Sequence, residues 1–160
     1  MKKILVTGGA GYIGSHTCAE LLFDGFEITV IDNLCNSKAD VLDRVQEITG
    51  KLLTFIEADL RNLSAIDKVF AEHDVSAVIH FAGLKAVGES VERPVSYYEN
   101  NVGGSLNLFQ AMENHDVFNI VFSSSATVYG DPKSLPIKED APVSPTNPYG
   151  RTKLIVEEIL

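Results

Sequence analysis

Apolar positions along this chain follow two alternating periods. Short runs in which nearly every residue is apolar or β-favouring occur at residues 4–7, 28–32, 52–56, 77–81 and 120–123. Between these runs, mostly apolar residues recur every three or four positions, as on one face of a helix. The recurrences comprise Ile13, Thr17 and Leu21; Val41, Val45 and Ile48; Ile66, Val69 and Phe70; and Val95, Tyr98, Val102, Leu106 and Phe109.

Strand-like and helix-like segments that take turns from the first residue predict an α/β fold. Apolar runs without alternation are typical of parallel strands covered on both faces. Right-handed strand-helix-strand connections then build a doubly wound, Rossmann-type parallel sheet with helices on both faces. Ligands of such sheets bind at the carboxyl ends of the strands.

The composition and the periodicity of the sequence change near the end of the chain. Residues 131–148 contain five prolines in eighteen positions, which predicts a long surface loop. A helix is expected over residues 149–160, and its Leu154, Ile155, Ile159 and Leu160 have no later element to pack against. We therefore expect a sheet that is incomplete at its carboxyl end, in a fragment of a longer protein.

Composition excludes several classes of function. The chain has 160 residues, 45% of them hydrophobic, and 22 acidic against 13 basic residues give a formal charge of -9. This charge disfavours nucleic acid and acidic membrane surfaces as partners. No apolar run approaches the roughly 18 residues of a membrane span, and the first residues lack a secretory signal, so a cytoplasmic protein is expected. Cys18 and Cys35 lack metal-ligand spacing and are predicted to be reduced packing residues.

A glycine frame follows the first predicted strand. Gly8, Gly11 and Gly14 occur in TGGAGYIG and lead directly into a helix. Glycines at this spacing allow a tight turn and a close approach of the backbone to a pyrophosphate, which the N-terminus of the helix attracts. The alternative is a glycine-rich turn without a ligand, and the strand before and the helix after argue against it.

Carboxylates follow the next two predicted strands. Asp32 stands eighteen residues beyond Gly14, where an acidic side chain accepts hydrogen bonds from an adenosine ribose and repels a 2′-phosphate. This position favours NAD over NADP, with Lys38 the one nearby cation in sequence, although Asp32 could instead cap a turn. Asp59 could meet an adenine amino group or cap the helix that follows.

Hydroxyl, phenol and ammonium groups gather in the last third of the chain. Tyr149 and Lys153 are four residues apart, hence on one helix face, where the ammonium would favour a phenolate base. Alone, such a pair also occurs at exposed helix surfaces. The fifth predicted strand runs into Ser123, Ser124 and Ser125, which either reach a ligand or satisfy the turn.

Two further segments place small or polar residues where a strand or helix should be apolar. These are residues 80–85 and 100–104, and such positions usually touch a ligand. His80 by itself is interpreted as a core histidine, and the four scattered histidines form no metal site.

The motifs TGGAGYIG, HFAGLKAVGES, SSSATVYGD and YGRTK, together with Asp32 and Asp59, resemble the extended short-chain dehydrogenase/reductase family over the whole chain. The resemblance implies an NAD-dependent isomerase that interconverts UDP-glucose and UDP-galactose in galactose metabolism, homodimeric at full length. It makes residues 1–160 the NAD-binding domain, without the carboxyl-terminal substrate domain. The implied NAD contacts are Gly8, Gly11, Tyr12, Ile13, Gly14, Asp32, Asn33, Leu34, Cys35, Asn36, Ser37, Asp59, Leu60, Phe81, Ala82, Gly83, Leu84, Lys85, Asn100, Ser123, Tyr149 and Lys153.

The resemblance also implies a catalytic set. Tyr149 would take the proton of the sugar 4-hydroxyl while C4 gives a hydride to NAD, Lys153 would support the phenolate, and Ser125 would bridge sugar and phenol. Lys85, Ser125 and Tyr149 would contact the substrate. A 4,6-dehydratase of nucleotide sugars is the alternative within the family, but Ala126 and Thr127 replace its acidic pair. Outside it, a dinucleotide-binding module or redox sensor without activity of its own stays open, and the 160 residues alone are expected to be inactive.

Overall fold

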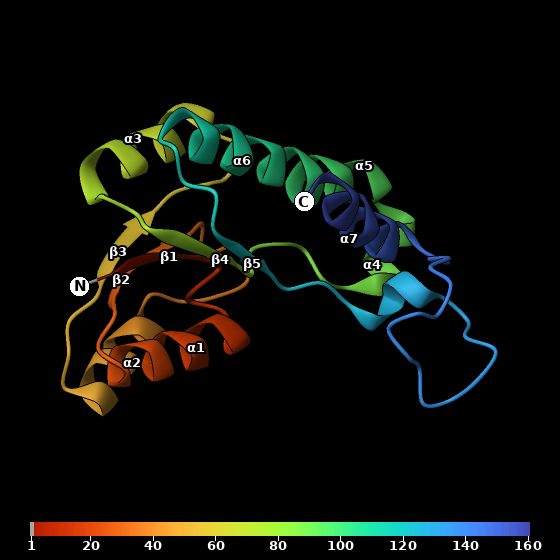
Figure 1. Ribbon diagram of the computed structural model, residues 1–160, viewed down its shortest axis with the longest axis horizontal. Coiled ribbons are helices and arrows are strands. Elements are labelled where there is room, and N and C mark those ends of the chain that lie inside the picture. The colour runs from red at the N-terminus through yellow and green to blue at the C-terminus, as the bar shows by residue number, and fades with distance from the viewer. Residues whose placement is uncertain (1) are drawn as a thin grey trace. The chain divides into compact units, whose positions relative to one another are not determined.

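The computed structural model describes residues 2–160, which form two compact units. The first unit comprises the chain up to Ala82 together with Leu106–Ser123, and the second comprises Gly83–Ser105 and Ser124–Leu160 (Figure 1). Within the described residues no helix is long and apolar enough to cross a membrane.

The first unit is built on a five-stranded sheet in the order β3-β2-β1-β4-β5. Every pairing in it is parallel, with registers such as Val6 opposite Val30 and Ile79. The predicted doubly wound α/β fold is thus confirmed. β3 begins two residues later than predicted, because its pairing with β2 starts at Thr54, and Leu52 before it is 86% exposed. The strands are β1 (Lys3–Thr7), β2 (Glu27–Asp32), β3 (Thr54–Glu57), β4 (Ala77–His80) and β5 (Ile120–Phe122).

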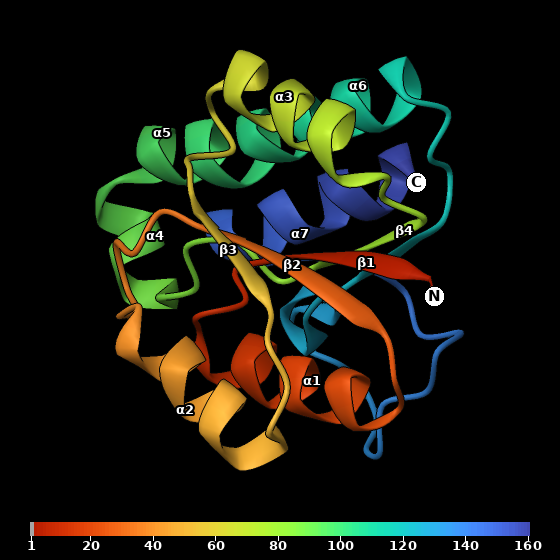
Figure 2. The same cartoon turned by 90° about the vertical axis from the view of Figure 1, so that its left-hand side faces the viewer.

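Helices cover both faces of this sheet. α1 (Tyr12–Phe23) and α2 (Asp40–Thr49) lie on one face, and α3 (Leu63–His73) and the part of α6 (Gly104–Asn114) in this unit lie on the other (Figure 2). Neighbouring residues of β1 serve opposite cores: Leu5 packs in the cluster of Ile66 and Leu108, and Val6 packs in the cluster of Cys18. The apolar strand runs therefore reflect burial on both faces.

The two cysteines differ in environment. Cys18 is fully buried, and burial raises the pKa of its thiol to about 12, as expected for a packing residue. Cys35 is exposed, so its prediction as a packing residue is wrong. The run containing it is a loop that follows β2, where hydrogen bonds to Asp32 and Asn33 replace apolar contacts.

The second unit is helical. α7 (Pro148–Ile159) packs on four short elements. They are α4 (Val87–Glu92), α5 (Pro94–Tyr97), the π-helix η1 (Tyr98–Gly103) and the 3-10 helix η2 (Ala126–Tyr129). Residues 131–147 form the predicted loop. Leu154 is buried, which corrects the expectation that it lacks a covering element, whereas Ile159 and Leu160 are exposed.

The helix predicted from Val95 to Phe109 is divided into α5, η1 and α6, and part of its buried face was assigned wrongly. Val95, Tyr98 and Leu106 are exposed, and Tyr97, Asn101 and Ser105 are buried instead. The physical reason is that three buried side chains of this stretch, unlike that of Leu108, are polar and hydrogen-bonded. A hydrophobic periodicity therefore misses these positions.

Candidate functional site

The glycine frame of the first unit connects β1 to α1. Gly8 has a φ of +69°, and a Cβ added there would lie 2.7 Å from the Ala82 amide nitrogen. A Cβ on Gly14 would overlap the Gly8 carbonyl oxygen. The backbone conformation thus excludes a side chain at both positions, so no side chain of these two residues covers the backbone of the turn.

The N-terminus of α1 carries no negative charge of its own. Gly11 is the N-cap, no side chain caps the helix, and its first turn contains no acidic residue. The first N–H groups of the helix, which no side chain caps, and the helix dipole attract an anion such as a pyrophosphate. Tyr12 and Ile13, at this end of α1, are exposed. The turn is therefore compatible with a phosphate cradle, and the phosphate contact stays a prediction.

Asp32 links this turn to the segment after β2. One carboxylate oxygen accepts the Ala10 N–H at 3.1 Å, and the other accepts the Leu34 N–H and the Ser37 hydroxyl, each at 2.9 Å. Asp32 therefore does cap a turn, which was the alternative interpretation of this residue. The same bonds order residues 33–37, and the ribose contact stays a prediction.

Asp59 does not cap α3. That helix is capped by Asn62, whose side chain accepts the Ala65 N–H at 3.2 Å, so the capping interpretation of Asp59 is wrong. Its carboxylate instead binds the Arg61 side chain through two bonds of 2.9 and 2.7 Å and accepts the Asn33 amide at 3.0 Å. These bonds, led by Arg61, hold the pKa of Asp59 well below its usual range. Neighbouring Leu60 is buried, and the adenine contact stays a prediction.

His80 is a core residue, as interpreted from the sequence. It is 1% exposed, and its Nδ1 lies 2.6 Å from the Thr7 hydroxyl. The same hydroxyl accepts the Ala82 N–H at 3.4 Å. His80 thus fixes the ends of β1 and β4, from which the partly buried Phe81 and Ala82 continue, and no group of three metal-ligating side chains exists among the described residues.

The second unit contains the tyrosine and lysine on α7. Lys153 is only 6% exposed, and its Nζ lies 5.9 Å from the centroid of the partly buried Tyr149 ring. The interpretation as an exposed surface pair is therefore wrong. Burial lowers the pKa of Lys153 to about 8, so the side chain remains mostly protonated at neutral pH. A cation next to a phenol favours the phenolate.

The serine segment is divided between the two units. The Ser123 N–H extends the strand ladder to the His80 carbonyl at 3.1 Å in the first unit. In the second unit, Ser124 donates to Glu157 of α7, and the Ser125 hydroxyl accepts the Thr127 N–H and hydroxyl at 3.3 and 2.9 Å. The serine-rich turn therefore satisfies its own backbone, and Ser125 shares a unit with Tyr149 and Lys153.

Asn101 connects separate segments of the second unit, and no role was predicted for it from the sequence alone. Its side chain is buried, accepts the Leu84 N–H at 2.8 Å and the Asn100 amide at 2.9 Å, and donates to the Leu84 carbonyl at 2.9 Å. It also donates to the Thr152 hydroxyl at 3.1 Å on α7. The signal was a polar residue inside a helical pattern. A Cβ on Gly83 would lie 3.8 Å from the Lys153 Nζ, so this loop runs beside the lysine, whereas Lys85 is exposed.

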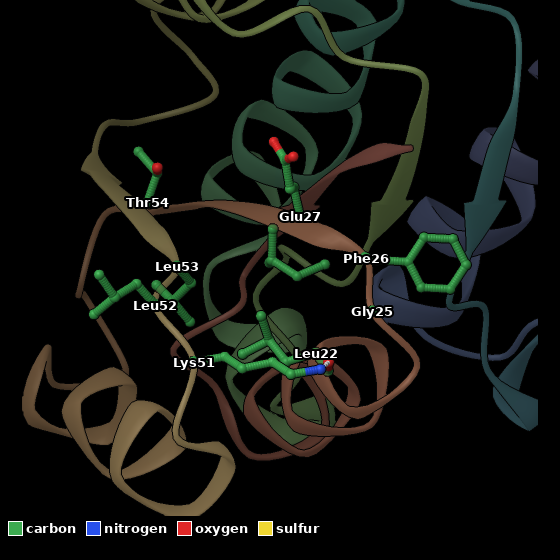
Figure 3. Close-up of a pocket in the computed structure, with 9 residues that line it drawn as sticks. Leu22, Gly25, Phe26, Glu27, Lys51, Leu52, Leu53 and Thr54 are labelled. Atoms are coloured by element: carbon green, nitrogen blue, oxygen red, sulfur yellow. Dashed lines mark hydrogen bonds between the residues drawn. The ribbon is translucent and has the colours of Figure 1, made fainter. Parts of the chain in front are cut away.

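A groove of about 510 Å³ lies at the amino ends of β2 and β3 (Figure 3). Asp32 stands at the other, carboxyl end of β2. On one side of it, the Lys51 ammonium donates to the Leu22 carbonyl at the end of α1. None of the predicted site residues lines this groove. Its lining comprises Leu22, Gly25, Phe26, Glu27, Ile28, Lys51, Leu52, Leu53 and Thr54.

Comparison with known proteins decides the family. Residues 4–160 match the NAD dependent epimerase/dehydratase family. The chain belongs to this family. Among curated members, a UDP-glucose 4-epimerase of Bacillus subtilis is 66% identical over 157 residues, which are 98% of this chain and 46% of that protein. One from Haemophilus influenzae is 60% identical over 98% of this chain and 47% of its own length.

Solved structures of family members share the fold. A UDP-glucose 4-epimerase from Bifidobacterium longum in complex with NAD+ and UDP has a TM-score of 0.97 and 51% identity over 99% of this chain and 48% of its own. The one from Stenotrophomonas maltophila, with bound NAD and formylated UDP-arabinopyranose, has a TM-score of 0.97 and 47% identity over 99% of this chain and 47% of its own. The chain spans about half the length of the relatives it matches.

Proposed function

We propose that this chain is the NAD-binding and catalytic portion of a UDP-glucose 4-epimerase, which interconverts UDP-glucose and UDP-galactose. The observation that carries the proposal is the buried Lys153 ammonium above the Tyr149 ring, in a chain that also has a glycine cradle and Asp32 after β2. The 66% identity to a curated UDP-glucose 4-epimerase supports the same activity. A cytoplasmic location and a homodimer at full length stay predictions.

The residues present fit NAD. The uncapped N-terminus of α1 suits the pyrophosphate, and the Asp32 carboxylate suits a ribose and disfavours a 2′-phosphate. Residues 33–37, Asp59, residues 81–85 and Asn100 would complete the contacts. NAD, when bound, supplies an acceptor and donor for the hydride of the sugar C4.

The proton chemistry belongs to side chains of the second unit. The Tyr149 phenol oxygen takes the proton of the sugar 4-hydroxyl and returns it when the carbonyl is reduced. The Lys153 ammonium stabilises the phenolate that accepts the proton and that forms again when the proton is returned. Ser125, whose hydroxyl already accepts two hydrogen bonds from Thr127, orients the sugar oxygen by donating its own proton. Tyr149 thus acts as base and then as acid.

Elimination of water is disfavoured by the residues after Ser125. A 4,6-dehydratase would carry an acidic pair there, but this chain has Ala126 and Thr127 on η2. An exposed Ala126 methyl group can neither donate nor accept a proton. We therefore propose epimerisation rather than dehydration.

Tyr149→Phe in the full-length protein tests the proposal. Conversion of UDP-galactose to UDP-glucose should fall by roughly 100- to 10,000-fold, the usual contribution of a general acid-base group, while NAD stays bound. Tyr98→Phe, at an exposed tyrosine, is the matched control and should keep the wild-type rate. Near-normal turnover by Tyr149→Phe, or a 4-keto-6-deoxy product from the wild type, would overturn the proposal.

A further inference from the structure

The first N–H groups of α7 all have acceptors or are absent. The helix begins with a proline, which has no N–H, and the Asn147 side chain accepts the Gly150 N–H at 2.8 Å. The Asn147 carbonyl accepts the Arg151 N–H at 3.0 Å. The remaining N–H, that of Tyr149, is accepted at 3.2 Å by the hydroxyl of Ser90 on α4. The backbone of the tyrosine is therefore tied to another element.

Ser90 is suited to this contact by burial and by the direction of its own hydrogen bond. The residue has no exposed surface, and its hydroxyl donates to the Val87 carbonyl at 2.6 Å. With the proton committed to Val87, the oxygen lone pairs face the Tyr149 N–H. An alanine at position 90 would leave that N–H without its acceptor beside a fully buried side chain, which is a costly arrangement.

The helix that carries Ser90 is itself held in place by Tyr97. The buried Tyr97 hydroxyl accepts the Ala86 N–H at 3.0 Å and lies 2.9 Å from the Ala86 carbonyl and 2.8 Å from a Glu89 carboxylate oxygen. Burial raises the pKa of Tyr97 to about 12, so the phenol keeps its proton for these acceptors. A six-residue helix needs such anchors, because short helices are unstable alone.

We propose that Ser90 is a positioning residue for Tyr149: its hydroxyl fixes the backbone of the tyrosine and thereby the place of the phenol over the substrate. The inference rests on the proposed function for the identity of the reaction. Residues 83–90 run without a break from the proposed NAD contacts at residues 83–85 into Ser90. One segment of chain thus places cofactor contacts and the catalytic tyrosine on a common support.

Ser90→Ala in the full-length protein tests this role by separating kcat from KM. We expect kcat for UDP-galactose to fall about tenfold, which corresponds to about 1.4 kcal/mol of barrier, with KM and NAD content unchanged. Ser105→Ala is the matched control, because Ser105 is also buried and its hydroxyl donates to the Asn101 carbonyl. It should keep the wild-type kcat. Ser90→Cys, with a weaker acceptor atom, should give an intermediate kcat.

Hydrogen exchange provides a readout that does not depend on turnover. Amides in the peptide spanning residues 147–153 should exchange faster in Ser90→Ala than in the wild type. In Ser105→Ala they should exchange at the wild-type rate. Unchanged kcat in Ser90→Ala, an equal loss in both variants, or unchanged exchange overturns the role of Ser90. A wild type without epimerase activity overturns the proposed function instead, and the exchange result still decides the Ser90 contact.

Discussion

Lys153 is a charged residue in a buried position, and its titration links the site to stability. Burial lowers the pKa of the folded state to about 8 from the ordinary 10.5, so between these values the unfolded chain binds the proton and the folded chain does not. Stability therefore rises with pH over this interval, and the contribution is lost as pH falls through about 8.

A pH series of unfolding experiments on the protein without NAD checks this. Between pH 8 and 10.5, the free energy of unfolding of the wild type should rise relative to that of Lys153→Met. The rise is about 1.4 kcal/mol per pH unit and reaches up to about 3 kcal/mol over the interval. Subtracting the free energy of unfolding of Lys153→Met from that of the wild type removes the contributions of the other lysines and tyrosines. A constant difference across the interval would contradict a lowered pKa.

Asp32 is the residue that should decide between the two dinucleotides. A carboxylate beside a 2′-phosphate costs roughly a few kcal/mol, so the full-length wild type should bind NADP at least about tenfold more weakly than NAD. Asp32→Ala should narrow this ratio, and Asp43→Ala, on the exposed side of α2, should leave it unchanged. Calorimetric titration with each dinucleotide measures the ratio. Equal affinities of the wild type for NAD and NADP would contradict a contact between Asp32 and the ribose.

At the scale of elements, caps define where the helices start. α3 is capped by Asn62 and not by Asp59, which pairs with Arg61. We expect Asn62→Ala to lower the free energy of unfolding by about 1 kcal/mol, the usual value for an N-cap, and Asn62→Ser to restore most of it. Chemical denaturation measures both variants. An Asn62→Ala variant as stable as the wild type would show that the cap bond contributes nothing.

At the scale of the whole molecule, the chain spans about half the length of its relatives. Epimerisation requires the sugar to be held against the cofactor, and positioning supplies up to roughly 7 to 11 kcal/mol of a barrier. We expect the 160 residues alone, with added NAD, to convert no UDP-galactose, and the full-length protein to convert it. Product analysis after long incubation compares the two, and robust turnover by the 160 residues would show that they contain the whole substrate site.

The succession of strands and helices, the parallel sheet and the glycine turn after the first strand could be predicted from the sequence alone. These features depend on periodicity and on residues adjacent in the chain, such as Gly8 to Gly14 after β1. His80 was also identified as a core residue, because a histidine within an apolar strand follows the strand into the interior.

Which polar residues are buried, and which partners they bind, depends on how the elements pack together. Tyr97, Asn101 and Ser90 have partners 8 to 59 residues away, and no local pattern distinguishes them from solvent-facing side chains. A buried polar group is stable only when a partner meets it, and that partner is supplied by the fold. The burial of Lys153 and the support of Tyr149 could therefore be found only once α4, η1 and α7 were packed together.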